Sequence, residues 1–342
     1  ALAVYDQVVA RFSSASEPAI FENVAKALFN KGVTLGGLGR SEDALAVYDQ
    51  VVARFSSASE PSILEQVAKA LVNKGVTLGA LGRSEDAIAV HDRVVARFAT
   101  ASEPAILENV ALALVNKGVR LGALGRSEAE IAVYDQVVAR FSSASEPAIL
   151  ESIARALVNK GVTLGVLGRS EDALAVFDQV VARFSSASEP AILEQIAMAL
   201  FNKGVTLGTL GRNEDEIAVY DQVVERFTDA SEPAILECVA KALFNKGVTL
   251  GGLGRGEDAI AVYDQVVARF ASASEPAILA QVANALFNKG VTLGALSRSG
   301  DAIAVFDQVV ARFAGAPALA DLVEKAKAAK SRLEGARSPK KP

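Results

Sequence analysis

The feature that most constrains this chain is a phrase that returns every 43 residues. Ala-Leu-Ala-Val-Tyr-Asp-Gln occupies residues 1–7 and stands unchanged at 44–50. Variants of the phrase begin at Ala87, Glu130, Ala173, Glu216, Ala259 and Ala302. A fixed period of this length indicates a stack of similar units, each in contact with its neighbours, and not one globular core.

The composition excludes several classes of protein. Hydrophobic residues make up 51% of the chain, so it can bury a large core and is not a disordered linker. Charged or amide residues interrupt every apolar stretch before it reaches membrane-spanning length, so we expect no membrane segment. The net charge of −5 gives no electrostatic support for binding nucleic acid.

The chain has one cysteine, Cys238, and one histidine, His91. A single cysteine excludes a disulfide within the chain and a cysteine-based metal cage. A single histidine excludes a multi-histidine metal site and argues against a Ser-His-Asp triad. We therefore expect no catalytic residues, no metal and no cofactor, and a cytoplasmic protein.

Each period predicts a helical hairpin. In the copy that starts at Ser16, Ser-Glu-Pro is a helix start with serine as the N-cap, and a first helix extends to about Leu38. Gly39 is the expected stop. Ser41 is the N-cap of a second helix by the same reasoning. The apolar stripes of the two helices are Ile20, Val24, Leu28, Leu35 and Leu38, then Ala44, Tyr48, Val51, Val52 and Phe55.

The segment 32–39 is rich in glycine and argues against a helix, because each interior glycine costs roughly 1 kcal/mol there. We still predict a helix, since the apolar stripe continues in phase through Leu35. A glycine at one position of every copy suggests close packing where a Cβ would not fit. These residues are Gly32, Gly75, Gly118, Gly161, Gly204, Gly247 and Gly290.

The repeats predict three regions. Residues 1–15 are the second helix of a truncated first repeat, and residues 16–313 are seven repeats of 43 residues. Residues 314–342 are a C-terminal capping helix, expected over Pro317 to Glu334, followed by a frayed basic tail. The expected fold class is all-α: a solenoid of helical hairpins.

The spacing of small and apolar residues resembles the tetratricopeptide repeat. The phrase is Ala25-x-x-Leu28-x-Asn30-x-Gly32-x-x-Leu35-x-x-x-Gly39-x-x-x-x-Ala44-Leu45-x-x-Tyr48, and it recurs through the array. The period exceeds the 34 residues of that family, and the excess precedes Ala25, which implies a longer first helix. The resemblance implies a right-handed superhelix whose first helices line a concave groove. Members of that family mostly bind extended peptides or protein segments there and are not themselves catalytic.

An asparagine stands at one position of every first helix: Asn30, Asn73, Asn116, Asn159, Asn202, Asn245 and Asn288. A carboxamide both donates and accepts hydrogen bonds, so a column of them can hold a peptide backbone without reading its side chains. Helices roughly 8–10 Å apart would place one amide at about every third residue of an extended chain. The alternative is that each asparagine bonds a neighbouring helix and only spaces the repeats. We favour the groove, because asparagine is unfavourable inside a helix.

Two further columns complete the predicted groove. Cationic residues one turn before the asparagine are Lys26, Lys69, Arg155 and Lys241. Apolar residues directly before it are Phe29, Val72, Val115, Val158, Phe201, Phe244 and Phe287. Such a groove would suit an extended segment with apolar anchors and some acidic residues, although solvated cations explain the first column equally well.

The remaining candidates favour structural roles. The lysine after each asparagine, such as Lys31, is expected to pair with a carboxylate such as Asp49 or its equivalents and not with a ligand phosphate. His91 takes the slot of Tyr48 and predicts packing. Cys238 takes the slot of Asn23 and predicts exposed helix surface.

The leading hypothesis is a scaffold that binds a protein or peptide in the groove. The first alternative is a self-assembling array that forms a dimer or filament through the open N-terminal end. Nucleic-acid binding is less favoured because of the acidic balance, and an enzyme is the least favoured.

Overall fold

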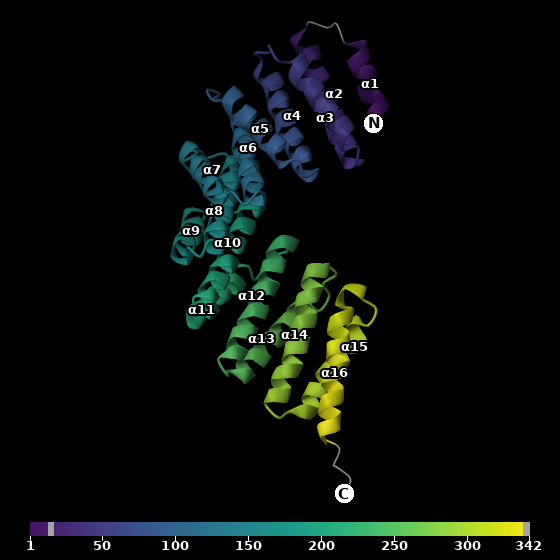
Figure 1. The fold of residues 1–342 in the computed structure, drawn as a ribbon, viewed down its shortest axis with the longest axis vertical. Coiled ribbons are helices and arrows are strands. Elements are labelled where there is room, and N and C mark those ends of the chain that lie inside the picture. The colour runs from purple at the N-terminus through teal and green to yellow at the C-terminus, as the bar shows by residue number, and fades with distance from the viewer. Residues whose placement is uncertain (13–16, 338–342) are drawn as a thin grey trace. The chain divides into compact units, whose positions relative to one another are not determined.

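The computed structural model describes residues 1–12 and 17–337, and every regular element within those ranges is a helix. The helices divide into two compact units, Ala1–Arg169 and Ser170–Pro342. Figure 1 shows each unit as a succession of paired helices. The all-helical prediction is confirmed, and the first six residues of each glycine-rich segment, such as 32–37, lie inside a helix.

The first unit holds three complete hairpins between two single helices. Its helices are α1 (Leu2–Arg11), α2 (Pro18–Gly37), α3 (Ser41–Arg54), α4 (Pro61–Ala80), α5 (Ser84–Arg97), α6 (Pro104–Ala123), α7 (Ser127–Arg140) and α8 (Pro147–Val166). Each first helix of a hairpin has 20 residues and each second helix has 14. We call these the long and the short helices.

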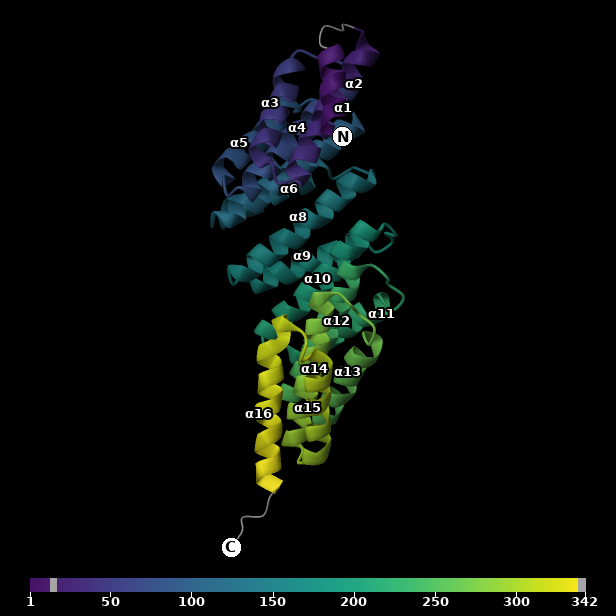
Figure 2. The same cartoon turned by 90° about the vertical axis from the view of Figure 1, so that its right-hand side faces the viewer.

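The second unit repeats this plan. Its helices are α9 (Ser170–Arg183), α10 (Pro190–Thr209), α11 (Asn213–Arg226), α12 (Pro233–Gly252), α13 (Gly256–Arg269), α14 (Pro276–Ala295), α15 (Ser299–Phe313) and α16 (Ala320–Arg337). A single 3₁₀ turn, Pro317–Leu319, precedes α16. In Figure 2, α16 lies beside α14 and α15, and it contacts both.

The caps of the helices differ from the prediction. The N-cap of a long helix is the glutamate of Ser-Glu-Pro, and the proline occupies the first turn, as expected. Glu60 folds back to accept a hydrogen bond from the backbone N–H of Ser59 at 3.2 Å. The serine side chain therefore does not cap, and Ser16 itself lies outside the described residues. The short helices likewise follow an arginine N-cap, such as Arg40, with no side-chain cap bond.

Six of the seven described long helices end in a glycine turn. Gly39 has φ of +74°, a conformation that costs other residues roughly 1–2 kcal/mol. Its N–H donates to the carbonyl of Gly36 at 3.0 Å, and the N–H of Arg40 donates to Leu35 at 2.9 Å. This pair of bonds is the Schellman motif. The predicted stop is confirmed, and one copy departs from it: Ser297 holds φ of 63° where the other copies have glycine.

The mid-helix glycines lie against an aromatic ring. A Cβ added at Gly32 would overlap the ring of Tyr48 on the short helix of the same hairpin. Gly118, Gly204 and Gly247 face Tyr134, Tyr220 and Tyr263 in the same way. The prediction of a close approach is confirmed at these glycines, and the close neighbour is a side chain.

The predicted stripes form the core with two exceptions, the half-buried Ile20 and the exposed Leu38. Val24, Leu28 and Leu35 are buried, as are the five stripe residues of α3. Leu38, by contrast, is 62% exposed, because it is the C-cap residue where the chain already leaves the helix. Its prediction as a core residue is wrong.

Three kinds of contact link successive hairpins: between long helices, between short and long helices, and between an arginine and the end of the preceding short helix. Within each unit, neighbouring long helices contact each other, and the short helices α3, α5, α7, α11 and α13 each contact the long helices before and after them. The guanidinium of Arg97 at the end of α5 donates to the carbonyl of Phe55 at the end of α3, at 3.2 Å. The same bond joins Arg140 to Phe98. These bonds satisfy carbonyls at helix ends that lack partners within the helix.

The final helix covers the last hairpin. Val323 and Ala326 of α16 are buried against it, and Lys330 pairs with Asp307 of α15 at 2.6 Å. The opposite side of α16 is charged, as a capping helix requires. The predicted frayed tail from residue 338 lies outside the described residues. Among those described, no helix is both long and apolar enough to cross a membrane.

Candidate functional site: the long-helix face

The asparagine column lies at the edge between long and short helices. Six of its members are half-buried, and Asn30 is exposed. The amide of Asn245 on α12 donates to the hydroxyl of Tyr220 on α11 at 3.2 Å, and Asn159 donates to Tyr134 at 3.4 Å. These bonds connect one hairpin to the next, so at these two residues the structure supports the spacing hypothesis. The bond to tyrosine uses one of the two N–H groups of the amide.

The residues before the asparagines fall into two classes. The valines at this position, Val72, Val115 and Val158, are at most 2% exposed. Because these side chains are buried, they cannot make the groove contacts that were predicted for them. Where the residue is phenylalanine, it is half-buried and packs on the aromatic ring of the short helix. The centroid distances are 6.4 Å for Phe29–Tyr48, 6.2 Å for Phe201–Tyr220, 6.3 Å for Phe244–Tyr263 and 5.7 Å for Phe287–Phe306.

The cations one turn earlier are partly exposed and already paired. Lys26, Lys69 and Lys241 each lie 2.5 Å from the glutamate four residues before them. Arg155 lies 3.9 Å from Glu151. Exposed pairs of this kind contribute little stability, roughly 0.3–0.5 kcal/mol. A ligand carboxylate would have to compete with the glutamates.

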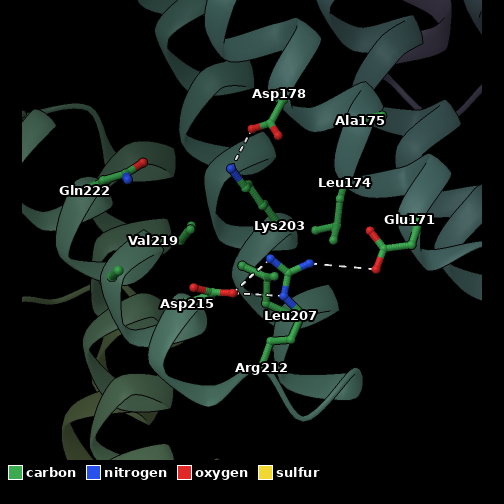
Figure 3. Close-up of a pocket in the computed structure, with 11 residues that line it drawn as sticks. Glu171, Leu174, Ala175, Asp178, Lys203, Leu207, Arg212, Asp215, Val219 and Gln222 are labelled. Atoms are coloured by element: carbon green, nitrogen blue, oxygen red, sulfur yellow. Dashed lines mark hydrogen bonds and ion pairs between the residues drawn. The ribbon is translucent and has the colours of Figure 1, made fainter.

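The lysine that follows each asparagine is structural, as predicted. Its ammonium pairs with an aspartate on the preceding short helix, at 2.5 Å for Lys74–Asp49, Lys160–Asp135 and Lys203–Asp178. Figure 3 shows the last of these pairs beside a cleft of about 440 Å³ between α9, α10 and α11. Arg212 in the same cleft pairs with Asp215 at 2.8 Å and with Glu171 at 3.7 Å. The charges drawn in that cleft are thus paired with one another.

The sequence analysis missed an exposed valine column on the long helices. The valine directly after each mid-helix glycine is 38–50% exposed in six copies: Val33, Val76, Val162, Val205, Val248 and Val291. The sequence contains a signal for this column, because every copy has an apolar residue on the polar side of the long helix. A residue on that side does not belong to the core. Such a column provides regularly spaced apolar contacts for a partner.

One open cleft brings the asparagine and valine columns together. It has a volume of about 470 Å³ and lies between α10, α11 and α12. Its lining comprises Val205, Gly208, Thr209, Asn213, Glu216, Tyr220, Asn245, Thr249 and Gly252. The amide of Asn245 and the side chain of Val205 thus lie at the same opening. Glu216 is only 7% exposed, and burial raises the pKa of its carboxyl group above the ordinary range.

The unique titratable residues have structural environments. His91 is fully buried against Gly75, and neither ring nitrogen has a hydrogen-bond partner. Burial, with Arg120 nearby, lowers the pKa of His91 to about 4, so the ring is neutral at pH 7 and fills the slot as predicted. Cys238 is 8% exposed, so its prediction as surface is wrong: its slot lies between successive long helices. Burial raises the pKa of this thiol to about 11, which leaves it a poor nucleophile.

The comparisons with known proteins identify the family. The tetratricopeptide-repeat family model matches residues 29–102, 158–231 and 244–317, well over half of the chain. The chain belongs to the tetratricopeptide-repeat family. This family is typical of protein-interaction scaffolds. Among the residues described, no group of three or more His, Cys, Asp or Glu side chains could hold a metal ion.

Solved structures share the fold of this tetratricopeptide-repeat array. The apo form of RapI has a TM-score of 0.61 and 11% identity, covering 84% of this chain and 76% of that one. The apo form of the quorum sensor NprR from B. thuringiensis has a TM-score of 0.52 and 11% identity, covering 89% and 80%. An engineered protein of the Northeast Structural Genomics Consortium has a TM-score of 0.52 and 14% identity, covering 97% and 78%. A search of curated proteins found no match.

Proposed function

We propose that this tetratricopeptide-repeat array is a non-catalytic, cytoplasmic scaffold that binds an extended polypeptide segment along the face of its long helices. The exposed valines provide apolar contacts, and the asparagine amides bond the backbone of the segment. The observation that carries the proposal is the open cleft in which Asn245 and Val205, from neighbouring long helices, lie at one mouth.

The groups exposed on the long-helix face determine which kind of partner it can bind. An extended chain has one N–H and one carbonyl per residue to pair, and the amides match both. The lysines near the asparagines already pair with glutamates of their own helices, so acidic residues in the segment are a secondary feature. The main-chain and apolar contacts set the affinity.

If the asparagines only space the repeats, their removal should not weaken the binding of a peptide. The array contains two asparagines at which this hypothesis can be tested against the proposed binding role. Asn159 and Asn245 bond tyrosines. The residue 25 positions before Asn202 is Phe177, which has no hydroxyl, and the corresponding residue for Asn116 is His91, whose nitrogens make no bond. Replacing Asn116 and Asn202 with alanine therefore removes two amides from the face without breaking a bond to a tyrosine.

The test uses peptides selected from a random 12-residue phage library against the wild-type protein. The affinity of a selected, fluorescently labelled peptide is then measured by fluorescence polarisation. We expect the Asn116→Ala/Asn202→Ala variant to bind at least about tenfold more weakly, since two net hydrogen bonds are lost. The matched control is Gln136→Ala/Gln222→Ala, which removes two amides from exposed positions on the short helices α7 and α11.

Equal affinity of the asparagine variant and the wild type would refute the role of the amides. Failure to select any peptide, with a mass in sedimentation that grows with concentration, would favour self-assembly instead.

A further inference from the structure

The cleft between α10, α11 and α12 differs chemically from the corresponding surface of the other hairpins. Three of its lining residues depart from the repeat. Thr209 stands where other copies have glycine, alanine or valine, and Asn213 stands where they have serine or glycine. Glu216 stands where five copies have alanine: Ala44, Ala87, Ala173, Ala259 and Ala302. These three departures lie around one opening.

Glu216 is not needed for the fold. The hairpins with alanine at this position have the same helices and the same ring-to-glycine contact as α10–α11. The glutamate is packed against the long helix, where a Cβ on Gly208 would lie 2.9 Å from its carboxyl carbon. Burying a carboxylate without a cation costs stability. A costly carboxylate that the repeat does not require, at an opening beside Thr209 and Asn213, indicates a ligand.

The carboxylate has unused acceptor capacity. The hydroxyls of Tyr220 and Thr249 lie within hydrogen-bonding reach of it. The single hydroxyl proton of Thr249 also serves the carbonyl of Asn245, at 3.1 Å. A carboxylate has about four acceptor sites, and two neutral hydroxyls, one of them shared, do not fill them. None of the described residues that line the cleft is a lysine, arginine or histidine.

We infer that this cleft binds the side chain of a lysine, with Glu216 as the counter-ion and Asn245 and the threonine hydroxyls as further acceptors. The inference deepens the proposed function, since the lysine belongs to the segment bound along the same face. Val205, Gly208 and Gly252 supply apolar and small surfaces for the aliphatic stem. A compact ammonium can pair with one oxygen of a glutamate that is only 7% exposed, whereas the planar fork of arginine pairs best with both oxygens.

The first unit contains a related network that serves as a control. Tyr134 donates to Glu130 at 3.1 Å, and Asn159 donates to Tyr134. Glu130 is 8% exposed, but Ala123 and Ser127 stand in the positions of Thr209 and Asn213. A Glu130→Gln variant therefore changes a buried carboxylate without touching the cleft.

The test is a titration of the full chain, labelled at valine and threonine methyl groups, followed by NMR. The probes are Nα-acetyl-lysine methylamide, its norleucine analogue, which keeps the stem and lacks the ammonium, and its arginine analogue. We expect the lysine probe to shift the methyl signals of Val205 and Thr249 in the wild type and in Glu130→Gln. Glu216→Gln should bind the probe at least about tenfold more weakly, because a charge-assisted hydrogen bond is lost.

Glu216→Ala provides a second variant. We expect it to fold, because five hairpins of the same chain have alanine at this position. It should melt at or above the wild-type temperature at pH 7 and show no response to the lysine probe. Equal shifts with the norleucine probe, an unchanged response in Glu216→Gln, or tighter binding of the arginine analogue would overturn the inference.

The probes are single amino acids, so their result does not depend on selecting a longer peptide. The cation site can fail while selected peptides still bind, and the peptide proposal can fail while the probe still titrates.

Discussion

The neighbouring hairpins α10–α11 and α12–α13 have the same architecture and different chemistry. Both have a 20-residue and a 14-residue helix, a glycine against a tyrosine ring, and a glycine turn between the helices. Only the first presents a threonine, an asparagine and a buried glutamate to an open cleft. Because the framework residues alone stabilise the hairpin, the positions around the cleft are free to vary with function.

The largest expected effect concerns the contact that the two hairpins share. Replacing Gly204 or Gly247 with leucine forces the tyrosine ring off the long helix, which should cost at least about 3 kcal/mol at either site. Thermal unfolding followed by circular dichroism measures both variants. A leucine tolerated in one hairpin and not in the other would show that the frameworks are not equivalent.

The hairpin α4–α5 extends the comparison, because it has His91 in the ring slot. Burial depresses the pKa of His91 from 6.5 to about 4, so folding favours the neutral ring. The stability that depends on neutral His91 is present above pH 6.5 and is lost as the pH falls towards 4, up to about 3 kcal/mol.

His91→Tyr should abolish this acid sensitivity, and at pH 7 it should stabilise the protein by about 1 kcal/mol, since two unpaired buried nitrogens are removed. Urea unfolding at pH 7 and pH 5 measures both effects. A wild type whose stability relative to His91→Tyr is the same at the two pH values would contradict the burial of a neutral imidazole.

The smallest expected effect concerns the turn of the last hairpin. Ser297 holds φ of 63°, whereas Gly254 of the preceding hairpin holds 75° without steric cost. Ser297→Gly should stabilise the protein by about 1 kcal/mol, reduced by the greater flexibility of glycine in the unfolded chain. The reverse change, Gly254→Ser, should destabilise by a similar amount. The melting temperature should rise in Ser297→Gly and fall in Gly254→Ser. Changes of the same sign in the two variants would rule out backbone strain as the cause.

The sequence by itself determined the helices, their order and their turns. The apolar period of Val24, Leu28 and Leu35 specifies a buried stripe, and Gly39 specifies a left-handed turn, because both signals act within one or two helical turns of chain. A close approach at Gly32 could also be anticipated, since glycine recurs where propensity disfavours it, but the structure was needed to show that the close neighbour is the Tyr48 ring.

Only the tertiary structure decided which flanks of those helices are covered. Val72 and Cys238 are buried by the neighbouring long helices, Val205 is exposed, and Asn245 bonds a tyrosine 25 residues earlier in the chain. These outcomes depend on the angle and offset between successive hairpins, which no local pattern encodes. The grouping of Thr209, Asn213 and Glu216 around one opening has the same origin. The packing of three helices brings together substitutions that the sequence shows only as separate positions.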